Sequence, residues 1–344
     1  MTRPEITILM SVHNGRPYLS EAIRSILAQT FDDFEFIIVD DGSTDGSGED
    51  LEQWESLDAR IRLIRQENQG LPVALNRGLR DARGWFVARM DADDISLPER
   101  LEMQLNFMRR HPGTGVLGTG IARLDAWGNL STETWPLPSS PGLTLWRTLF
   151  DSALAHPTVM FRRDVLERFG GYDESLRRAQ DFELWMRLAL HTRMQSLPEV
   201  LLHRRVNGQG KVRPPPEVDA LLLQSMALFH SRVLGRAPNE EDVSFCRRIY
   251  GQPAQRETVR ALLTRIRYLK DLYRGILVRS EDARADRLAI REDLHHKILK
   301  VAYEVQRSRP FLGQSLKAFS PERGRILLRY LRIGLHRDWK SDQV

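Results

Sequence analysis

Apolar and polar residues recur along the first 130 residues with two periods, one typical of strands and the other of helices. Short β-branched runs such as 34–39 predict buried strands. Between these runs, apolar residues recur every three or four positions, as in 17–29, which predicts amphipathic helices. Because strands joined by helical crossovers form parallel sheets, the pattern predicts a doubly wound α/β fold. The expected strands are 7–12, 34–39, 61–66 and 85–90, and the expected helices are 17–29, one through Leu51, Trp54 and Leu57, 72–82 and 98–111.

The pattern changes beyond residue 127. Residues 127–142 are rich in Gly, Pro, Ser and Thr, which predicts a long loop. The prolines of 213–217 then separate an α/β domain, expected at 1–210, from a helical region, expected at 211–344. The remaining elements expected are a strand and short helix at 156–170, a helix at 180–191, a strand at 197–206, and helices at 218–234, 255–279, 284–306 and 320–334.

Composition limits the class of protein. With 41% hydrophobic residues among 344, the chain can build a core. Its one cysteine, Cys246, excludes an internal disulfide framework and a cysteine-based zinc site, so a reducing cytoplasm is the expected compartment. Since no run of about 18 apolar residues occurs, we expect no transmembrane helix.

Positive charge is concentrated toward the C-terminus. Residues 261–344 hold 19 Lys and Arg against 10 Asp and Glu, whereas the other 260 residues hold 32 against 36. Within this region, 320–334 is a basic amphipathic stretch that fits shallow attachment to an anionic membrane surface. Packing against the α/β domain or a partner subunit is the alternative. We expect no nucleic-acid partner, and a protein that is cytoplasmic or peripheral at the inner face of the cell membrane.

Two acidic clusters follow predicted strands, VDDGSTDGS at 39–47 and MDADD at 90–94. In an open parallel sheet, ligands bind beyond the carboxyl ends of the strands. Asp40 and Asp41 suit a base ring N–H and a ribose hydroxyl. Asp91 and Asp93 could together hold one hard divalent cation, Mg²⁺ or Mn²⁺, bridging a diphosphate. A solvated turn is the alternative for either cluster alone, and Asp94 is expected to cap the helix near Pro98 or to support the cation site.

Two other motifs are weaker. Residues 41–52 nearly match a calcium-binding EF-hand loop, but a strand precedes them and Gly48 stands where that loop needs an apolar residue. Residues 113–118 match GxGxxG, yet they follow a helix and lie in a strand-like run instead of opening a helix. Neither motif changes the reading of the acidic clusters.

In their order, ILMSVHN (8–14), VDDGSTD (39–45), QENQGLPVALNRGL (66–79) and MDADD (90–94) resemble the motifs of family 2 glycosyltransferases. These are inverting enzymes that use nucleotide sugars and have the GT-A fold, a Rossmann-like domain with a mostly parallel sheet. The resemblance covers about 5–210, and it implies a metal site at Asp91 and Asp93. The nucleotide-sugar contacts that it implies are Val12, Asn14, Asp40, Asp41, Asn68, Gly70, Asn76 and Asp91.

The segment 156–189 is similar to the family's acceptor-side segment, where a Glu-Asp pair heads a helix. Here the pair is Gln180-Asp181, which implies Asp181 as the general base and His156, Gln180 and Trp185 on the acceptor side. Two further positions differ from the family pattern. Leu75 stands where members often carry Arg, and Asn207 stands where many place a metal-binding His, which leaves Asn207 as a weaker metal ligand.

The resemblance implies transfer of a sugar from a nucleotide diphosphate sugar, most commonly a UDP-sugar, to a saccharide or lipid-linked acceptor, as in cell-surface polysaccharide assembly. Because Gln180 and Asn207 depart from the family, a nucleotide-sugar-binding subunit or sensor without turnover is the alternative. Nucleotidyl transfer is disfavoured, since no Gly-rich loop with Lys or Arg follows the first strand.

Overall fold

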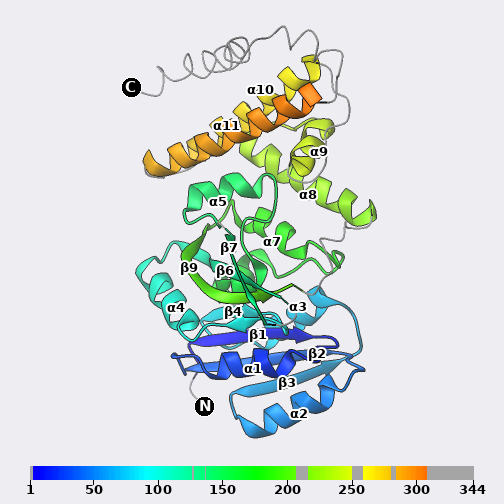
Figure 1. The fold of residues 1–344 in the computed structure, drawn as a ribbon, viewed down its shortest axis with the longest axis vertical. Coiled ribbons are helices and arrows are strands. Elements are labelled where there is room, and N and C mark those ends of the chain that lie inside the picture. The colour runs from blue at the N-terminus through cyan, green and yellow to red at the C-terminus, as the bar shows by residue number, and fades with distance from the viewer. Residues whose placement is uncertain are drawn as a thin grey trace.

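A nine-stranded mixed sheet is the centre of the molecule (Figure 1). The computed structural model describes residues 3–125, 128–135, 137–206, 216–249, 259–279 and 284–307. The strand order is β3-β2-β1-β4-β8-β6-β9-β5, with β7 paired to β6. The strands are β1 (Ile6–Val12), β2 (Phe34–Asp41), β3 (Ile61–Gln66), β4 (Phe86–Met90), β5 (Ile95–Ser96), β6 (Thr114–Leu124), β7 (Leu130–Trp135), β8 (Met160–Arg162) and β9 (Arg193–Arg205).

The first four long strands, β3, β2, β1 and β4, run parallel. Their carboxyl ends therefore meet at one edge of the sheet, where Val12 lies opposite Asp40 in the β1–β2 register. Strand β8 runs antiparallel to both β4 and β6, and β9 runs parallel to β6. Strands β1, β2 and β4 are almost wholly buried because helices cover both faces, which explains their continuous apolar runs.

Helices pack on both faces of the sheet. One face forms a core with α1, α2 and α4, and the other forms a core with α3, α6 and α7. The helices are α1 (Leu19–Leu27), α2 (Ser47–Leu57), α3 (Leu71–Asp81), α4 (Arg100–Arg110), α5 (Pro141–Thr148), α6 (Arg163–Phe169), α7 (Gln180–Leu188), α8 (Pro216–Leu234), α9 (Glu240–Arg248), α10 (Val259–Arg279) and α11 (Arg284–Arg307), with a 3-10 turn at His156–Thr158.

A third core joins the α/β part to the C-terminal helices. Helices α5 and α7 lie between the sheet and α8–α11 (Figure 1). Phe182 and Met186, one turn apart on α7, share this core with Trp146 of α5 and with residues of α8–α11. Leu184 and Trp185 belong to the core on the sheet side. Helix α7 is therefore apolar on two sides, because it packs against both the sheet and the helical region.

The strands and helices expected in the first 125 residues are present, and the α/β fold class with C-terminal helices is confirmed. The predicted loop at 127–142 was wrong in part. Strand β7 pairs with β6, and α5 begins at Pro141, a residue favoured in the first turn of a helix. Helix α9 was not predicted. The helix expected at 320–334 and the domain boundary expected near 210 lie outside the described residues.

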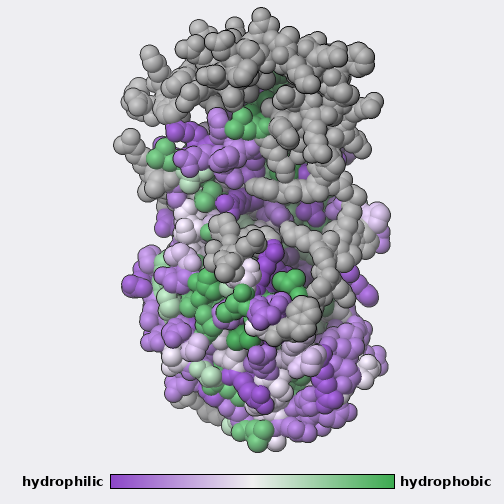
Figure 2. Space-filling view, in the orientation of Figure 1, coloured by the Kyte–Doolittle hydropathy of each residue, from purple (hydrophilic) through white to green (hydrophobic). Residues whose placement is uncertain are grey.

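Hydrophobic residues gather at mid-height of the face seen in Figure 2, over the part where Figure 1 shows β6, β7 and β9. Leu130 of β7 is 52% exposed. Among the helices of the described residues, none has the length and hydropathy to cross a membrane.

Candidate active site

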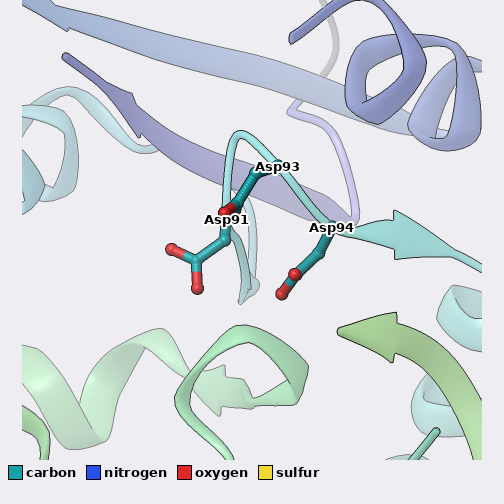
Figure 3. A group of neighbouring side chains, drawn as sticks. All are labelled: Asp91, Asp93 and Asp94. Carbon is teal, nitrogen blue, oxygen red and sulfur yellow. The ribbon is translucent and has the colours of Figure 1, made fainter. Parts of the chain in front are cut away.

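Three carboxylates stand together on the loop between β4 and β5 (Figure 3). One oxygen each from Asp91, Asp93 and Asp94 lies within 4.8 Å of the other two. Figure 3 shows the carboxylates of Asp91 and Asp94 directed to the same side of the loop. Burial raises the pKa of Asp93, and the charge of Asp91 raises it further. Burial, then Asp91 and Asp93, raise the pKa of Asp94 well above its ordinary value.

The partners of these carboxylates come from neighbouring strands. Arg89, buried at the end of β4, forms an ion pair with Asp91. The backbone N–H of Arg205, at the end of β9, donates to Asp94 Oδ1 at 2.8 Å. Asp94 Oδ2 is buried and has no hydrogen-bond partner among the described residues. Of the two roles expected for Asp94, capping the next helix was wrong, because that helix begins at Arg100 and no side chain caps it, while support of a cation site stays a prediction.

This donor set fits a hard divalent cation. Carboxylate oxygens are the ligands that Mg²⁺ and Mn²⁺ prefer, and a cation would relieve the repulsion that raises the pKa values of Asp93 and Asp94. The orphaned Oδ2 of Asp94 would gain a positive neighbour there. The predicted weaker ligand, Asn207, lies outside the described residues.

The carboxylate of Asp41 is bonded within the protein. Its Oδ1 accepts from Gln66 Nε2 at 2.8 Å and from the backbone N–H of Gln69 at 2.9 Å, and its Oδ2 accepts from the N–H of Gly70 at 2.9 Å. Asp41 therefore ties the segment after β3 to the end of β2. Asp40 Oδ1 accepts from the N–H of Ser43 at 3.0 Å, which shapes the turn after β2.

The turn after β1 meets the turn after β2. Asn14, in the left-handed region with φ 56°, accepts from the N–H of Thr44 at 2.8 Å. Gly42 has φ +73°, and a Cβ there would lie 2.7 Å from the backbone N of Asn68, so only glycine fits this approach. Val12 is fully buried at the end of β1. The structure thus brings together the expected positions 12, 14, 40, 41, 68 and 70.

His13 was not among the predicted site residues. Its Nδ1 lies 2.9 Å from the backbone oxygen of Asp41, and Asn68 Nδ2 lies 3.0 Å from its ring nitrogens. It thus bridges the ends of β1, β2 and β3. The sequence did carry a signal for His13, its position between the predicted contacts Val12 and Asn14. A polar ring that directly follows β1 lies at the carboxyl edge of the sheet, where ligands bind.

Asn76 lies away from these turns, on the helix α3. Its Nδ2 donates to Tyr172 O at 2.8 Å and to Glu174 at 2.9 Å, and its Oδ1 accepts from the N–H of Tyr172 at 2.9 Å. These bonds attach the segment before α7 to α3. Leu75, where the family often has Arg, is fully buried in the core beside the sheet.

Asp181 lies in the first turn of α7, after Ala179 in the left-handed conformation. Burial raises its pKa, although the hydroxyl of Ser152, which donates to Asp181 Oδ2 at 3.0 Å, lowers it. The same Ser152 Oγ accepts from Trp185 Nε1 at 3.0 Å. Gln180, which precedes Asp181 in the chain, is also buried. Ser152 is a second site residue that the sequence did not reveal, because nothing local marks a serine 29 residues from its acidic partner.

The other residues expected on the acceptor side, His156 and Trp185, belong to a buried aromatic group with Tyr172. His156 Nε2 lies 2.8 Å from the hydroxyl of Tyr172, and its ring contacts that of Trp185 edge-on. Burial, then the charge of Arg89, lowers the pKa of His156 well below its ordinary value, so the ring is neutral. Burial raises the pKa of Tyr172, which lies within electrostatic reach of both Asp181 and Asp91. Arg89 and Tyr172 are thus both within electrostatic reach of Asp91, on the loop after β4, and of Asp181.

Known proteins are similar to this chain in sequence and in fold. The sequence pattern described as "Glycosyl transferase family 2" matches residues 7–170. The Bacillus subtilis protein EpsE is 35% identical over 188 residues, which are 54% of this chain and 66% of EpsE. The "O-antigen biosynthesis glycosyltransferase WbnJ" of Escherichia coli is 33% identical over 210 residues, which are 60% of this chain and 81% of WbnJ.

A similar fold is found in S. aureus TarS. The crystal structure of TarS 1–349 "in complex with UDP-GlcNAc" has a TM-score of 0.58 and 21% identity, covering 90% of this chain and 92% of that one. This likeness is one of fold, and it extends into the C-terminal helices. The family pattern includes the acidic loop after β4, and WbnJ is matched over 81% of its own length at 33% identity, so the chain belongs to glycosyltransferase family 2 and its α/β part has the GT-A fold.

Proposed function

We propose that this protein transfers a sugar, with inversion, from a nucleotide diphosphate sugar to a saccharide or lipid-linked acceptor. The observation that carries the proposal is the pair of acidic groups on one side of the sheet. Three carboxylates follow β4 and Asp181 lies in the first turn of α7, with Tyr172 within electrostatic reach of both groups. The naming of WbnJ as an enzyme of O-antigen biosynthesis supports a role in assembling a cell-surface polysaccharide.

On the donor side, the turns after β1, β2 and β3 would hold the nucleotide. Asp40, Asn14 and Asn68 line these turns together with His13, while Asp41 fixes their geometry through its three hydrogen bonds. Because TarS was crystallised with UDP-GlcNAc, a UDP-sugar is the first donor to test. Asp91 and Asp93 would hold Mg²⁺ or Mn²⁺, whose chemistry when bound is Lewis-acid stabilisation of the diphosphate.

On the acceptor side, Asp181 would act as the general base. Its carboxylate takes the proton of the acceptor hydroxyl while that oxygen bonds to the sugar carbon, and the bond from this carbon to the diphosphate breaks with its electron pair. A pKa raised by burial makes Asp181 a stronger base than an exposed aspartate. Neutral His156 and Tyr172 would shape the acceptor side without competing for the proton.

The α/β region and the helical region would have different roles. We assign the donor and acceptor machinery to residues 1–210 and a supporting role to the helical region 211–344. The basic stretch 320–334 would bring the enzyme to an anionic membrane surface, where lipid-linked acceptors reside.

A second candidate function is a nucleotide-sugar-binding subunit without turnover. The observation in its favour is neutral Gln180, which is buried beside Asp181 at the position where the family carries an acid. It would bind the donor through the same turns and leave the acceptor hydroxyl unactivated.

The experiment is a panel of UDP-, GDP- and dTDP-sugars, measured by melting shift and by hydrolysis with Mn²⁺ or with EDTA. We expect one donor class to raise the melting temperature and to be hydrolysed, with both effects lost in EDTA. Asp181→Asn should keep the melting shift and reduce turnover by about 10² to 10⁴-fold. Binding without turnover in the wild type would instead support the second candidate.

A further inference from the structure

The carboxylate of Asp181 ends a hydrogen-bonded chain of three side chains. Trp185 Nε1 donates to Ser152 Oγ at 3.0 Å, and Ser152 Oγ donates to Asp181 Oδ2 at 3.0 Å. An indole N–H can only donate, so Ser152 Oγ is the acceptor in its bond with Trp185. The hydroxyl proton of Ser152 is therefore free to be donated to another group. The acceptors within reach of that proton are Asp181 Oδ2 and, at 3.2 Å, the backbone oxygen of Leu154. A bond to a carboxylate is the stronger of the two.

The three side chains of this hydrogen-bonded series are held in place by other contacts. Trp185 is fully buried and stacks on Phe161 of β8, with ring centroids 5.8 Å apart. Ser152 lies in the short segment between α5 and the 3-10 turn, where its backbone N–H donates to Asp151 at 2.9 Å. Because Asp181 and Trp185 are one turn apart on α7, the indole and the carboxylate reach the same serine.

We infer that Ser152 is a positioning residue for the base: its hydroxyl, oriented by Trp185, holds Oδ2 of Asp181 and leaves Oδ1 to meet the acceptor. This inference deepens the proposed function and rests on Asp181 being the base. The hydrogen bond itself can be tested whether or not Asp181 is the base.

Other groups act on Asp181 from the elements around it. Burial is the main cause that raises its pKa, and the charge of Asp151 also raises it. After Ser152, the backbone N–H of Phe182 and the charge of Arg89 lower it, while Tyr172 faces it as a neutral phenol. Ser152 is the largest of the lowering causes, so its removal should raise the pKa of Asp181 further.

The test compares wild type and Ser152→Ala by chemical denaturation from pH 4 to pH 7. A carboxyl group whose folded pKa exceeds its unfolded value of about 3.9 binds more protons in the folded state, so stability falls as pH rises through that window. Ser152→Ala should lose more stability than wild type over the same rise. We expect the ratio of their folding equilibrium constants to grow about tenfold between pH 4 and pH 7, which corresponds to one pKa unit.

Three variants serve as controls. Ser152→Thr keeps the hydroxyl and should restore the wild-type pH dependence. In an Asp181→Asn background, Ser152→Ala should have the same effect at every pH, because the titrating group is gone. Ser56→Ala, at an exposed position of α2, removes a serine that donates to a backbone oxygen and should change nothing with pH.

A stability loss in Ser152→Ala that is equal at all pH values would overturn the inference, and so would no loss. The proposed function fails separately, if Asp181→Asn hydrolyses donor as fast as wild type. If both hold, the acidic limb of the hydrolysis rate against pH should move up by about one unit in Ser152→Ala, with a smaller change on the plateau. Trp185→Phe, which leaves Ser152 Oγ without its donor, should shift the limb in the same direction.

Discussion

At the scale of single residues, Asp93 is expected to lower the stability of the metal-free protein and to contribute to cation binding. Its pKa is raised by burial and by Asp91, which means that its charge is unfavourable in the metal-free protein. Removing that charge with Asp93→Asn should raise the melting temperature of the metal-free protein by about 1–3 °C near pH 7. The gain should vanish as pH falls and Asp93 becomes protonated. The same variant should lose the melting shift that Mn²⁺ produces in wild type.

Thermal melting with EDTA and with Mn²⁺ measures both effects of Asp93→Asn. Asp45→Asn is the matched control, because Asp45 is a turn carboxylate whose pKa is lowered by its hydrogen bonds with Ser47, against burial. It should destabilise the protein and leave the Mn²⁺ response intact. An Asp93→Asn protein that is less stable without metal, or that still responds to Mn²⁺, would argue against a cation site here.

The residue types of the site could be predicted from sequence, but their partners could not. Two aspartates flanking an alanine after a buried strand predict a cation site from local spacing alone. Asp94 is bonded to Arg205, 111 residues away, so its burial depends on how β9 returns to the sheet. The pairing of Ser152 with Asp181 likewise exists only after α5 and α7 have packed.

At the scale of elements, the segment before α7 is attached to α3 by one side chain. Asn76 makes three hydrogen bonds to Tyr172 and Glu174, and a Cβ at Gly171 would lie 2.4 Å from Asn76 Oδ1. We expect Asn76→Ala to lower the free energy of unfolding by about 1–3 kcal/mol, because the backbone N–H and C=O of the buried residue Tyr172 lose their bonds. Denaturant unfolding measures this loss.

Asn76→Asp separates the two roles considered for this residue. It keeps the oxygen that accepts from Tyr172, but it places a second carboxylate oxygen against Tyr172 O and the carboxylate of Glu174, so near pH 7 its stability should fall below that of Asn76→Ala. Donor affinity, measured by calorimetry, should stay within about twofold in both variants. A loss of donor affinity at full stability would instead identify Asn76 as the nucleotide-sugar contact that the family resemblance implies.

Elements were predictable where burial made their pattern regular. Strands β1, β2 and β4 are covered on both faces, so their sequences are continuous apolar runs. Strand β7 pairs only with β6, and its sequence LSTETW has no such run. Its position is set by its pairing with Ile121 and Leu124 of β6, which lie outside the segment 130–135 itself. Local composition therefore predicted a loop where pairing with β6 produced a strand.

At the scale of the whole molecule, charge is distributed unevenly. The stretch 320–334 places four arginines, at 323, 325, 329 and 332, among apolar residues. We expect the full chain to sediment with anionic vesicles at low salt and to be released at high salt, because salt screens the attraction between arginine and anionic lipid. Replacing the four arginines by Glu should abolish sedimentation without changing donor hydrolysis. Binding to neutral vesicles, or by the Glu variant, would contradict an electrostatic attachment.

The C-terminal helices also contact the segment that carries Ser152, the hydrogen-bond partner of Asp181, through His230 of α8. Its Nε2 donates to the backbone oxygen of Leu149 at 2.9 Å, and its Nδ1 accepts from the Tyr268 hydroxyl at 2.8 Å. Leu149 lies just after α5, three residues before Ser152. Trp146 of α5 further donates to Asp293 of α11 at 2.6 Å. The helical region therefore fixes the end of α5 from which the partner of Asp181 extends.

This contact predicts that the helical region affects turnover and leaves donor binding unchanged. His230→Ala should lower the rate of donor hydrolysis severalfold, while calorimetry gives an unchanged donor affinity. Burial lowers the pKa of His230 to about 4, below its unfolded value of about 6.5, so wild type should lose stability as pH falls from 6.5 to 4. His230→Ala should lack this part of the pH dependence.

Arg236→Ala, which removes an exposed ion pair with Asp271, is the control and should cost less than about 1 kcal/mol with no effect on turnover. Equal losses of donor affinity and turnover in His230→Ala would show that the helices support the whole site and not its acceptor side.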